Sequence, residues 1–173
     1  NLKGEENNKV IFSKIFSYFV YGAMILFLVI SLFAGDIIHF RIGNFTFLAK
    51  DYWSGIVIIP YVLMAYFFFG LYTNLNIASY FENKISYLII SSGAGFISNL
   101  IFNFILIPRY DITGAALATM LSYFIMFAVL YYLSQKVYHI PYDIVRSVLI
   151  IIIALVLYFL NLFLPELINL GTI

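Results

Sequence analysis

A regular row of polar and small side chains runs through an otherwise apolar stretch of the sequence. Ser92, Gly95, Asn99 and Asn103 recur at spacings of three and four residues, which places them on one side of a helix. Isoleucine, leucine and phenylalanine occupy the other faces. An amide in hydrocarbon needs a hydrogen-bond partner, so we expect this row to face another helix or a wet cavity. Two uses stay open, hydrogen bonding between helices and contact with a polar substrate.

Patterns typical of catalysis or metal binding are missing from the sequence. No acidic residue lies deep in an apolar stretch, so a relay of buried carboxylates is not visible. His39 and His139 have no metal-ligand spacing, and the chain has no cysteine. We find neither a glycine-rich phosphate loop nor a serine–histidine–aspartate set. The sequence therefore predicts no enzyme, no cofactor and no metal site, and its net charge of +1 gives no footprint for nucleic acid.

The elements that carry these residues are predicted to be membrane-spanning helices. The chain is 64% hydrophobic and 10% charged, whereas a soluble domain is about half apolar and about a quarter charged. A span needs roughly 20 apolar residues, and the alternation typical of a membrane barrel is missing. We predict an all-α, polytopic membrane bundle with five transmembrane helices at about 15–34, 53–73, 85–107, 114–133 and 144–164.

Small residues and a proline indicate how these helices pack. Gly114, Ala118 and Ser122 stand four residues apart, and together with Gly95 they are candidates for helix packing, because small side chains let backbones approach closely. Pro60 lies near the middle of the second predicted span, where it removes one backbone hydrogen bond. Pro60 is therefore the candidate for a helix bend, with a static kink of no functional role as the alternative.

The distribution of basic residues predicts the orientation of the chain. Three of them, Arg41, Lys50 and Arg109, fall in the connectors after the first and third predicted spans. The other six fall on the opposite side: Lys3, Lys9, Lys14, Lys84, Lys136 and Arg146. Because basic residues concentrate on the cytoplasmic side, we expect the N-terminal segment in the cytoplasm and the loops 36–51 and 108–113 outside.

The turn between the third and fourth predicted spans resembles a transporter signature. It reads Asn103-Phe-Ile-Leu-Ile-Pro108-Arg109-Tyr110-Asp111-Ile-Thr-Gly114-Ala115-Ala116-Leu-Ala118-Thr119. This is similar to the bacterial polysaccharide (O-antigen, Wzx-type) flippases of the multidrug/oligosaccharidyl-lipid/polysaccharide exporter superfamily. The segments 59–75 and 134–142 also resemble that family, so the likeness is strongest from about 51 to 143. One departure is Asp111, where the family usually has glycine.

The resemblance implies a lipid-linked sugar exporter. Residues 1–173 would form a single membrane domain, a fragment of the C-terminal lobe of a longer transporter of fourteen helices in the bacterial inner membrane. The whole protein would flip a polyprenyl-pyrophosphate-linked oligosaccharide by alternating access for surface polysaccharide (lipopolysaccharide) biosynthesis. Its partners would be membrane lipid, that substrate and the missing N-terminal lobe.

The polar row supplies candidate residues for such an exporter, and competitors stay open. The candidates for the substrate cavity are Ser92, Asn99, Asn103 and Arg109. Arg109 would attract the anionic head group at the external mouth, and the alternative is a basic residue that only sets the topology. The alternatives are a multidrug or peptidoglycan-precursor exporter of the same superfamily, a membrane enzyme of the same pathway such as a polymerase or ligase, and a structural membrane subunit.

Overall fold

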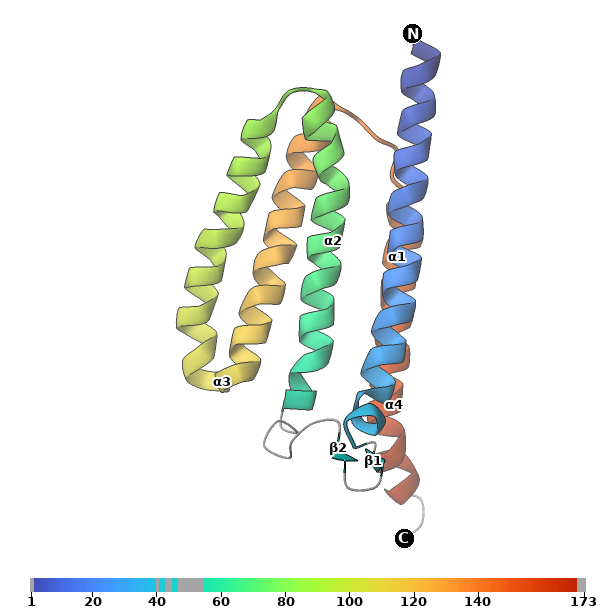
Figure 1. Ribbon diagram of the computed structural model, residues 1–173, viewed down its shortest axis with the longest axis vertical. Helices are drawn as coiled ribbons and strands as arrows, with labels where there is room; N and C mark the ends of the chain where they lie inside the picture. The colour runs from blue at the N-terminus through green and yellow to red at the C-terminus, as the bar shows by residue number, and fades with distance from the viewer. Residues whose placement is uncertain (1, 40, 43–44, 47–54, 171–173) are drawn as a thin grey trace.

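The protein is built almost entirely from long helices. The computed structural model describes the backbone of residues 2–39, 41–42, 45–46 and 55–170, and the side chains of 6–35 and 55–163. The helices are α1 (Leu2–His39), α2 (Ile59–Phe81), α3 (Ile85–Val137) and α4 (Ile144–Leu170) (Figure 1). After α1, the two-residue strands β1 (Arg41–Ile42) and β2 (Phe45–Thr46) pair in antiparallel fashion, with Arg41 opposite Thr46. The predicted all-α class is confirmed.

The number of spans differs from the prediction. Within the described residues, four helices are long and apolar enough to cross a membrane, where we predicted five. The difference lies in α3, an element of 53 residues that covers the third and fourth predicted spans and joins two helices across a kink. A straight helix of that length would extend about 80 Å at about 1.5 Å per residue, well beyond a hydrocarbon layer of about 30 Å.

Helix α3 is not straight, because its backbone reverses at Asp111. That residue has φ 47° and ψ −126°, which are not helical angles, and one helical segment lies on each side of it. Figure 1 shows the first arm (85–110) running to the turn and the second arm (112–137) returning beside it. The separate loop predicted at 108–113 is therefore wrong, since helical turns continue on both sides of Asp111.

Helix α2 is displaced along the sequence from the second predicted span. A short 3-10 turn occupies 55–58, and α2 then runs from Ile59 to Phe81 instead of 53–73. Pro60 consequently lies in the first helical turn, where its missing N–H leaves no intrahelical bond unmade and its fixed φ suits the helix. The expected position of Pro60 in mid-helix is wrong, and a bending role for it remains a prediction.

Helical segments that follow one another in the sequence alternate in direction, whereas α1 and α4 are parallel neighbours. The ring centroids of Phe12 and Phe81 lie 5.7 Å apart and those of Phe19 and Phe67 lie 6.2 Å apart, so α1 and α2 are antiparallel. Phe27 lies 5.7 Å from Tyr158, and α1 and α4 run in the same direction. The start of α1, the turn 82–84 and the linker 138–143 therefore share one end of the molecule, and the Asp111 reversal lies at the other (Figure 1).

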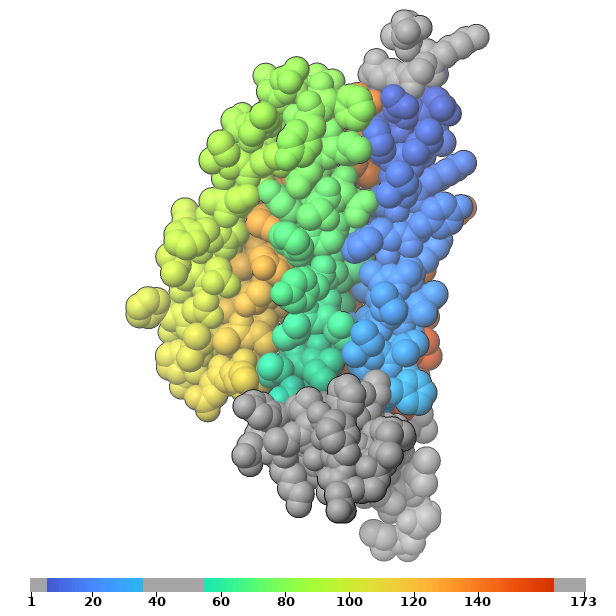
Figure 2. Space-filling view, viewed as in Figure 1, coloured from blue at the N-terminus to red at the C-terminus, as the bar shows by residue number. Residues whose placement is uncertain are grey.

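The core is small and much of the apolar surface is exposed. Val20, Leu75 and Leu130 are fully buried where α1, α2 and the second arm of α3 meet. By contrast, Phe104 is 85% exposed and Ile89 is 70% exposed on the first arm of α3. Figure 2 shows α1, α2 and this arm forming one continuous face. Apolar side chains in such numbers on the outside indicate a membrane-embedded protein.

The four packing candidates, Gly95, Gly114, Ala118 and Ser122, are all buried in α3. A Cβ on Gly114 would lie 2.6 Å from the carbonyl carbon of Leu106 and 2.9 Å from the nitrogen of Ile107. These are backbone atoms, which cannot rotate away. A Cβ on Gly95 would instead meet the flexible Met126 side chain at 3.1 Å. Close contact between the two arms of α3 therefore depends most on Gly114.

We predict that Gly114→Ala destabilises the protein more than any alanine replacement at an open glycine. The added methyl group must push the first arm away from the second, and overpacking of this kind costs about 1–3 kcal/mol. Gly93→Ala is the matched control, because a Cβ at Gly93 would meet no neighbouring atom within 4 Å and alanine favours helix. Unfolding followed by circular dichroism in detergent measures both variants. Equal stability of the two would contradict the close approach at Gly114.

Candidate functional site

The polar row on the first arm of α3 lines a groove against the second arm. The groove has a volume of about 330 Å³. On the first arm the groove is lined by Ser92, Gly95 and Asn99 of the predicted sets, and on the second arm by Ser122. The full lining is Ser92, Gly95, Phe96, Asn99, Thr119, Ser122, Tyr123 and Met126. The reversal at Asp111 thus brings together residues that lie apart in the sequence. Asn103 lies one turn beyond this lining.

The two asparagines bond to each other along the helix. The Nδ2 of Asn103 donates to the Oδ1 of Asn99 at 2.9 Å. Both side chains are half-buried. In the described part of the chain neither amide bonds to another helix. The NH₂ group of Asn99 is left as a donor beside the groove.

Ser92 makes the cross-helix contact that the asparagines do not. Its Oγ lies 3.0 Å from the hydroxyl of Tyr72, which joins α2 to the first arm of α3. Tyr72 itself is buried, and Ser92 is exposed. The spacing of aromatic residues in α2 gives no signal for this contact, because it depends on how the two helices are rotated against each other.

The second arm presents hydroxyls that are already engaged. Ser122 Oγ donates to the carbonyl of Ala118 at 2.6 Å, and Thr119 Oγ1 donates to Ala115 at 3.0 Å. Their oxygens can therefore accept a hydrogen bond from a ligand but have no free proton to donate. The groove has no acid, base or charged side chain in its lining. Its chemistry is suited to binding hydroxyl or amide groups.

Arg109 lies outside the groove. It is exposed, near the Asp111 reversal, and does not belong to the lining residues. Ten helical residues separate it from Asn99, a distance of about 15 Å along the axis. The structure therefore brings together Ser92 and Asn99 with two of the packing candidates, Gly95 and Ser122, and it leaves Arg109 at one end of the molecule.

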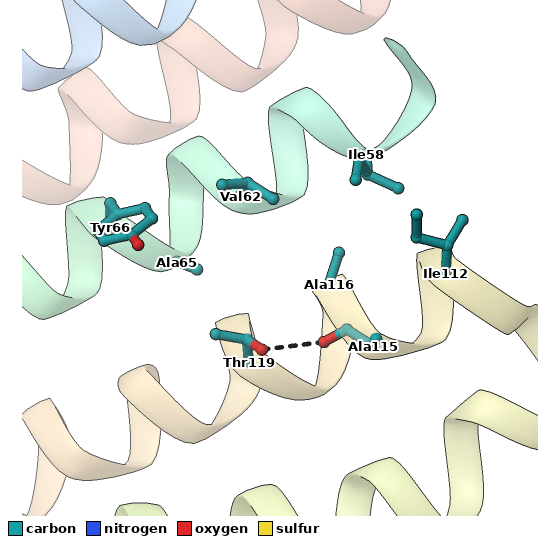
Figure 3. Close-up of a pocket in the computed structure, with 8 residues that line it drawn as sticks. All are labelled: Ile58, Val62, Ala65, Tyr66, Ile112, Ala115, Ala116 and Thr119. Carbon is teal, nitrogen blue, oxygen red and sulfur yellow. Dashed lines mark hydrogen bonds between the residues drawn. The ribbon is translucent and has the colours of Figure 1, made fainter. Parts of the chain in front are cut away.

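Two other hollows are apolar. One, of about 290 Å³, lies between the start of α2 and the second arm of α3. Figure 3 shows Val62 and Tyr66 on one side of it, Ile112 and Ala116 on the other, and the hydroxyl of Thr119 turned to its own helix. The other, of about 330 Å³, has lining residues from all four helices: Phe27, Pro60, Tyr61, Met64, Phe68, Met120, Leu155, Tyr158, Phe159 and Leu162. Both suit hydrocarbon or aromatic groups.

The linker 138–143 holds one ionisable group with a perturbed pKa. Burial, followed by the nearby Tyr131, raises the pKa of Tyr142 well above its ordinary value of 10.0. Its ring packs on Phe16, with centroids 4.6 Å apart. The phenol therefore stays neutral at physiological pH and anchors the linker to α1. Among the described residues, no group of three histidine, cysteine or acidic side chains could hold a metal ion.

Comparisons with known proteins identify no relative. No family model matches the chain, and no curated protein and no solved structure matches it either.

We predict that the groove is wet and the opposite face of the same arm is not. The chain has no native cysteine, so single-cysteine variants need no background removal. Asn99→Cys should react with a hydrophilic maleimide in membranes at least about tenfold faster than Phe104→Cys, because a thiol in lipid ionises poorly. Labelling followed by gel shift measures both rates. Faster reaction of the Phe104→Cys variant would place the polar row against lipid.

Proposed function

We propose that this chain is part of a transporter that moves a polar, lipid-linked molecule across a membrane. The observation that carries the proposal is the groove between the arms of α3. It gathers Ser92 and Asn99 on a helix whose other exposed side chains include many large apolar ones, such as Ile89, Phe96 and Phe104. A polar head group cannot cross about 30 Å of hydrocarbon unaided, so a transporter must offer it hydrogen-bond partners inside an apolar shell.

In this proposal both arms of α3 cross the membrane, which gives five crossings. Each arm contains more than twenty residues, enough for about 30 Å at about 1.5 Å per residue. The N-terminal segment then lies in the cytoplasm, because the end of the molecule with the start of α1, the turn 82–84 and the linker 138–143 carries most of the basic residues.

The turn motif supports an oligosaccharide on polyprenyl pyrophosphate as the substrate. The stretch from Asn103 to Thr119 resembles the polysaccharide flippases, and the structure places its glycine at a close contact between the two arms. In this account the groove forms one wall of an alternating-access cavity in a bacterial inner membrane, and a second lobe of the same protein forms the other. The uncharged lining suits sugar hydroxyls.

One observation favours a second candidate, an exporter of apolar small molecules. The cavity between the helices is lined by aromatic residues and by Met64 and Met120, and such adaptable apolar linings are typical of drug-sized sites. In that case the cavity near Pro60, and not the groove, would hold the cargo.

We predict that replacing Asn99 and Asn103 by leucine in the full-length transporter impairs glycan export. The double variant N99L/N103L removes both amides of the polar row and should lower surface polysaccharide by about tenfold or more, as for loss of buried polar recognition. The control N99S/N103S replaces each amide by a hydroxyl, which can still hydrogen-bond, and should retain export. Protease-protection and immunoblotting verify insertion, and surface polysaccharide is quantified on gels.

Measurements of glycan export and of dye efflux distinguish the two candidate functions. Met120→Trp fills the apolar cavity and should leave glycan export intact, while N99L/N103L lowers it. Unchanged polysaccharide in N99L/N103L, with dye efflux lost in Met120→Trp, would favour the exporter of apolar molecules.

A further inference from the structure

A polar pocket lies between α1 and the start of α4, and it shares no lining residue with the groove. Its volume is about 330 Å³, and it is lined by Ser13, Lys14, Ser17, Tyr18, Tyr21, Asp143 and Arg146. It differs from the two apolar hollows because charged and hydroxyl groups form most of its wall. The basic residues come from opposite parts of the sequence, so the fold assembles this site.

Short-range contacts fix the geometry of the pocket. Ser13 Oγ donates to the carbonyl of Pro141 at 2.6 Å, which ties α1 to the linker before α4. Arg146 Nε lies 3.1 Å from Asp143 Oδ2, and the backbone nitrogen of Arg146 donates to Asp143 Oδ1 at 3.3 Å. Asp143 therefore holds the first turn of α4 and orients the guanidinium at the pocket.

The charges of the pocket sum to +1. Asp143 forms an ion pair with Arg146, while Lys14 forms no ion pair with any residue that the structure describes. The side chain of Arg146 is 74% exposed, so the N–H groups that do not face Asp143 are open to a ligand. One net positive charge with several donors complements a single negative charge on a phosphate diester, the group that guanidinium and ammonium donors bind best.

Exposed apolar surface extends from the pocket along both helices. On α1, Ile25 lies about three turns after Lys14 and is 62% exposed. On α4, Leu149 and Ile153 lie one and two turns after Arg146 and are 53% and 56% exposed. Because α1 and α4 run in the same direction, both apolar faces lead away from the charges toward the middle of the bundle. This is the arrangement of a lipid, with a charged head and two hydrocarbon tails.

We propose that this pocket binds the phosphate-bearing head group of an anionic phospholipid, whose acyl chains lie on the exposed faces of α1 and α4. Basic pockets between helices at the cytoplasmic surface bind anionic lipids in this way. The inference needs the chain to lie in a membrane, and it does not depend on the transported cargo. A bound lipid here would hold the start of α4 against α1.

The test is lipid retention by the purified full chain in detergent, measured by native mass spectrometry. Phosphatidylglycerol should be retained in preference to phosphatidylcholine. Lys14→Gln should weaken phosphatidylglycerol binding about fivefold, the effect of one basic residue near the surface. Asp143→Asn keeps an oxygen to accept from the Arg146 backbone and raises the net charge, so it should strengthen binding.

Lys136→Gln is the matched control, because it removes the same charge at the same end of the molecule. Lys136 lies 4.0 Å from the centre of the Tyr132 ring and outside the pocket. Equal loss in Lys136→Gln and Lys14→Gln, or equal retention of the two lipids, would overturn the proposal. Displacement of phosphatidylglycerol by millimolar inorganic phosphate would overturn it too, because the site would then bind a free anion.

Discussion

The reversal of α3 at Asp111 is the constraint on which the rest of the bundle depends. Its dihedral angles, φ 47° and ψ −126°, are close to those of the first central residue of a type II′ turn, a region that glycine adopts readily and other residues rarely. Such a conformation costs about 1–3 kcal/mol and persists only where packing enforces it. Here two contacts between the arms enforce it: the backbone of Leu106 lies close to Gly114, and the Met126 side chain packs on Gly95. Without the reversal, the polar row on the first arm would have no second wall.

Most serines in the described helices donate to the backbone of their own helix. Ser91, Ser98 and Ser134 donate to carbonyls three or four residues earlier. This satisfies each hydroxyl inside its own helix, so these serines need no partner from a neighbouring helix. The Ser92–Tyr72 contact joins two helices, and the NH₂ group of Asn99 lies beside the groove as a hydrogen-bond donor. The polar capacity of α3 is therefore concentrated on one side of its first arm.

Composition and spacing predicted the helical class and the side-by-side position of Ser92, Gly95 and Asn99, because both follow from hydropathy and helical periodicity. The limits of α2 could not be predicted in the same way. Asn74 looked like the start of a loop, yet its Nδ2 donates to the carbonyl of Gly70 and the helix continues. The pocket at Lys14 and Arg146 was also missed, since it depends on which helices become neighbours. The predicted loop began at Pro108, but Pro108 lies inside the helix and the backbone reverses at Asp111.

The sidedness of the Asp111 turn tests the central claim most directly. In single-cysteine variants of the full chain in sealed vesicles, a membrane-impermeant thiol reagent should reach Asn83→Cys and His139→Cys from the same side, and Asp111→Cys only from the opposite side. This result follows if each arm of α3 crosses the bilayer. Labelling of Asp111→Cys from the side that labels the other two would contradict two crossings, and with them the folded-back helix in the membrane.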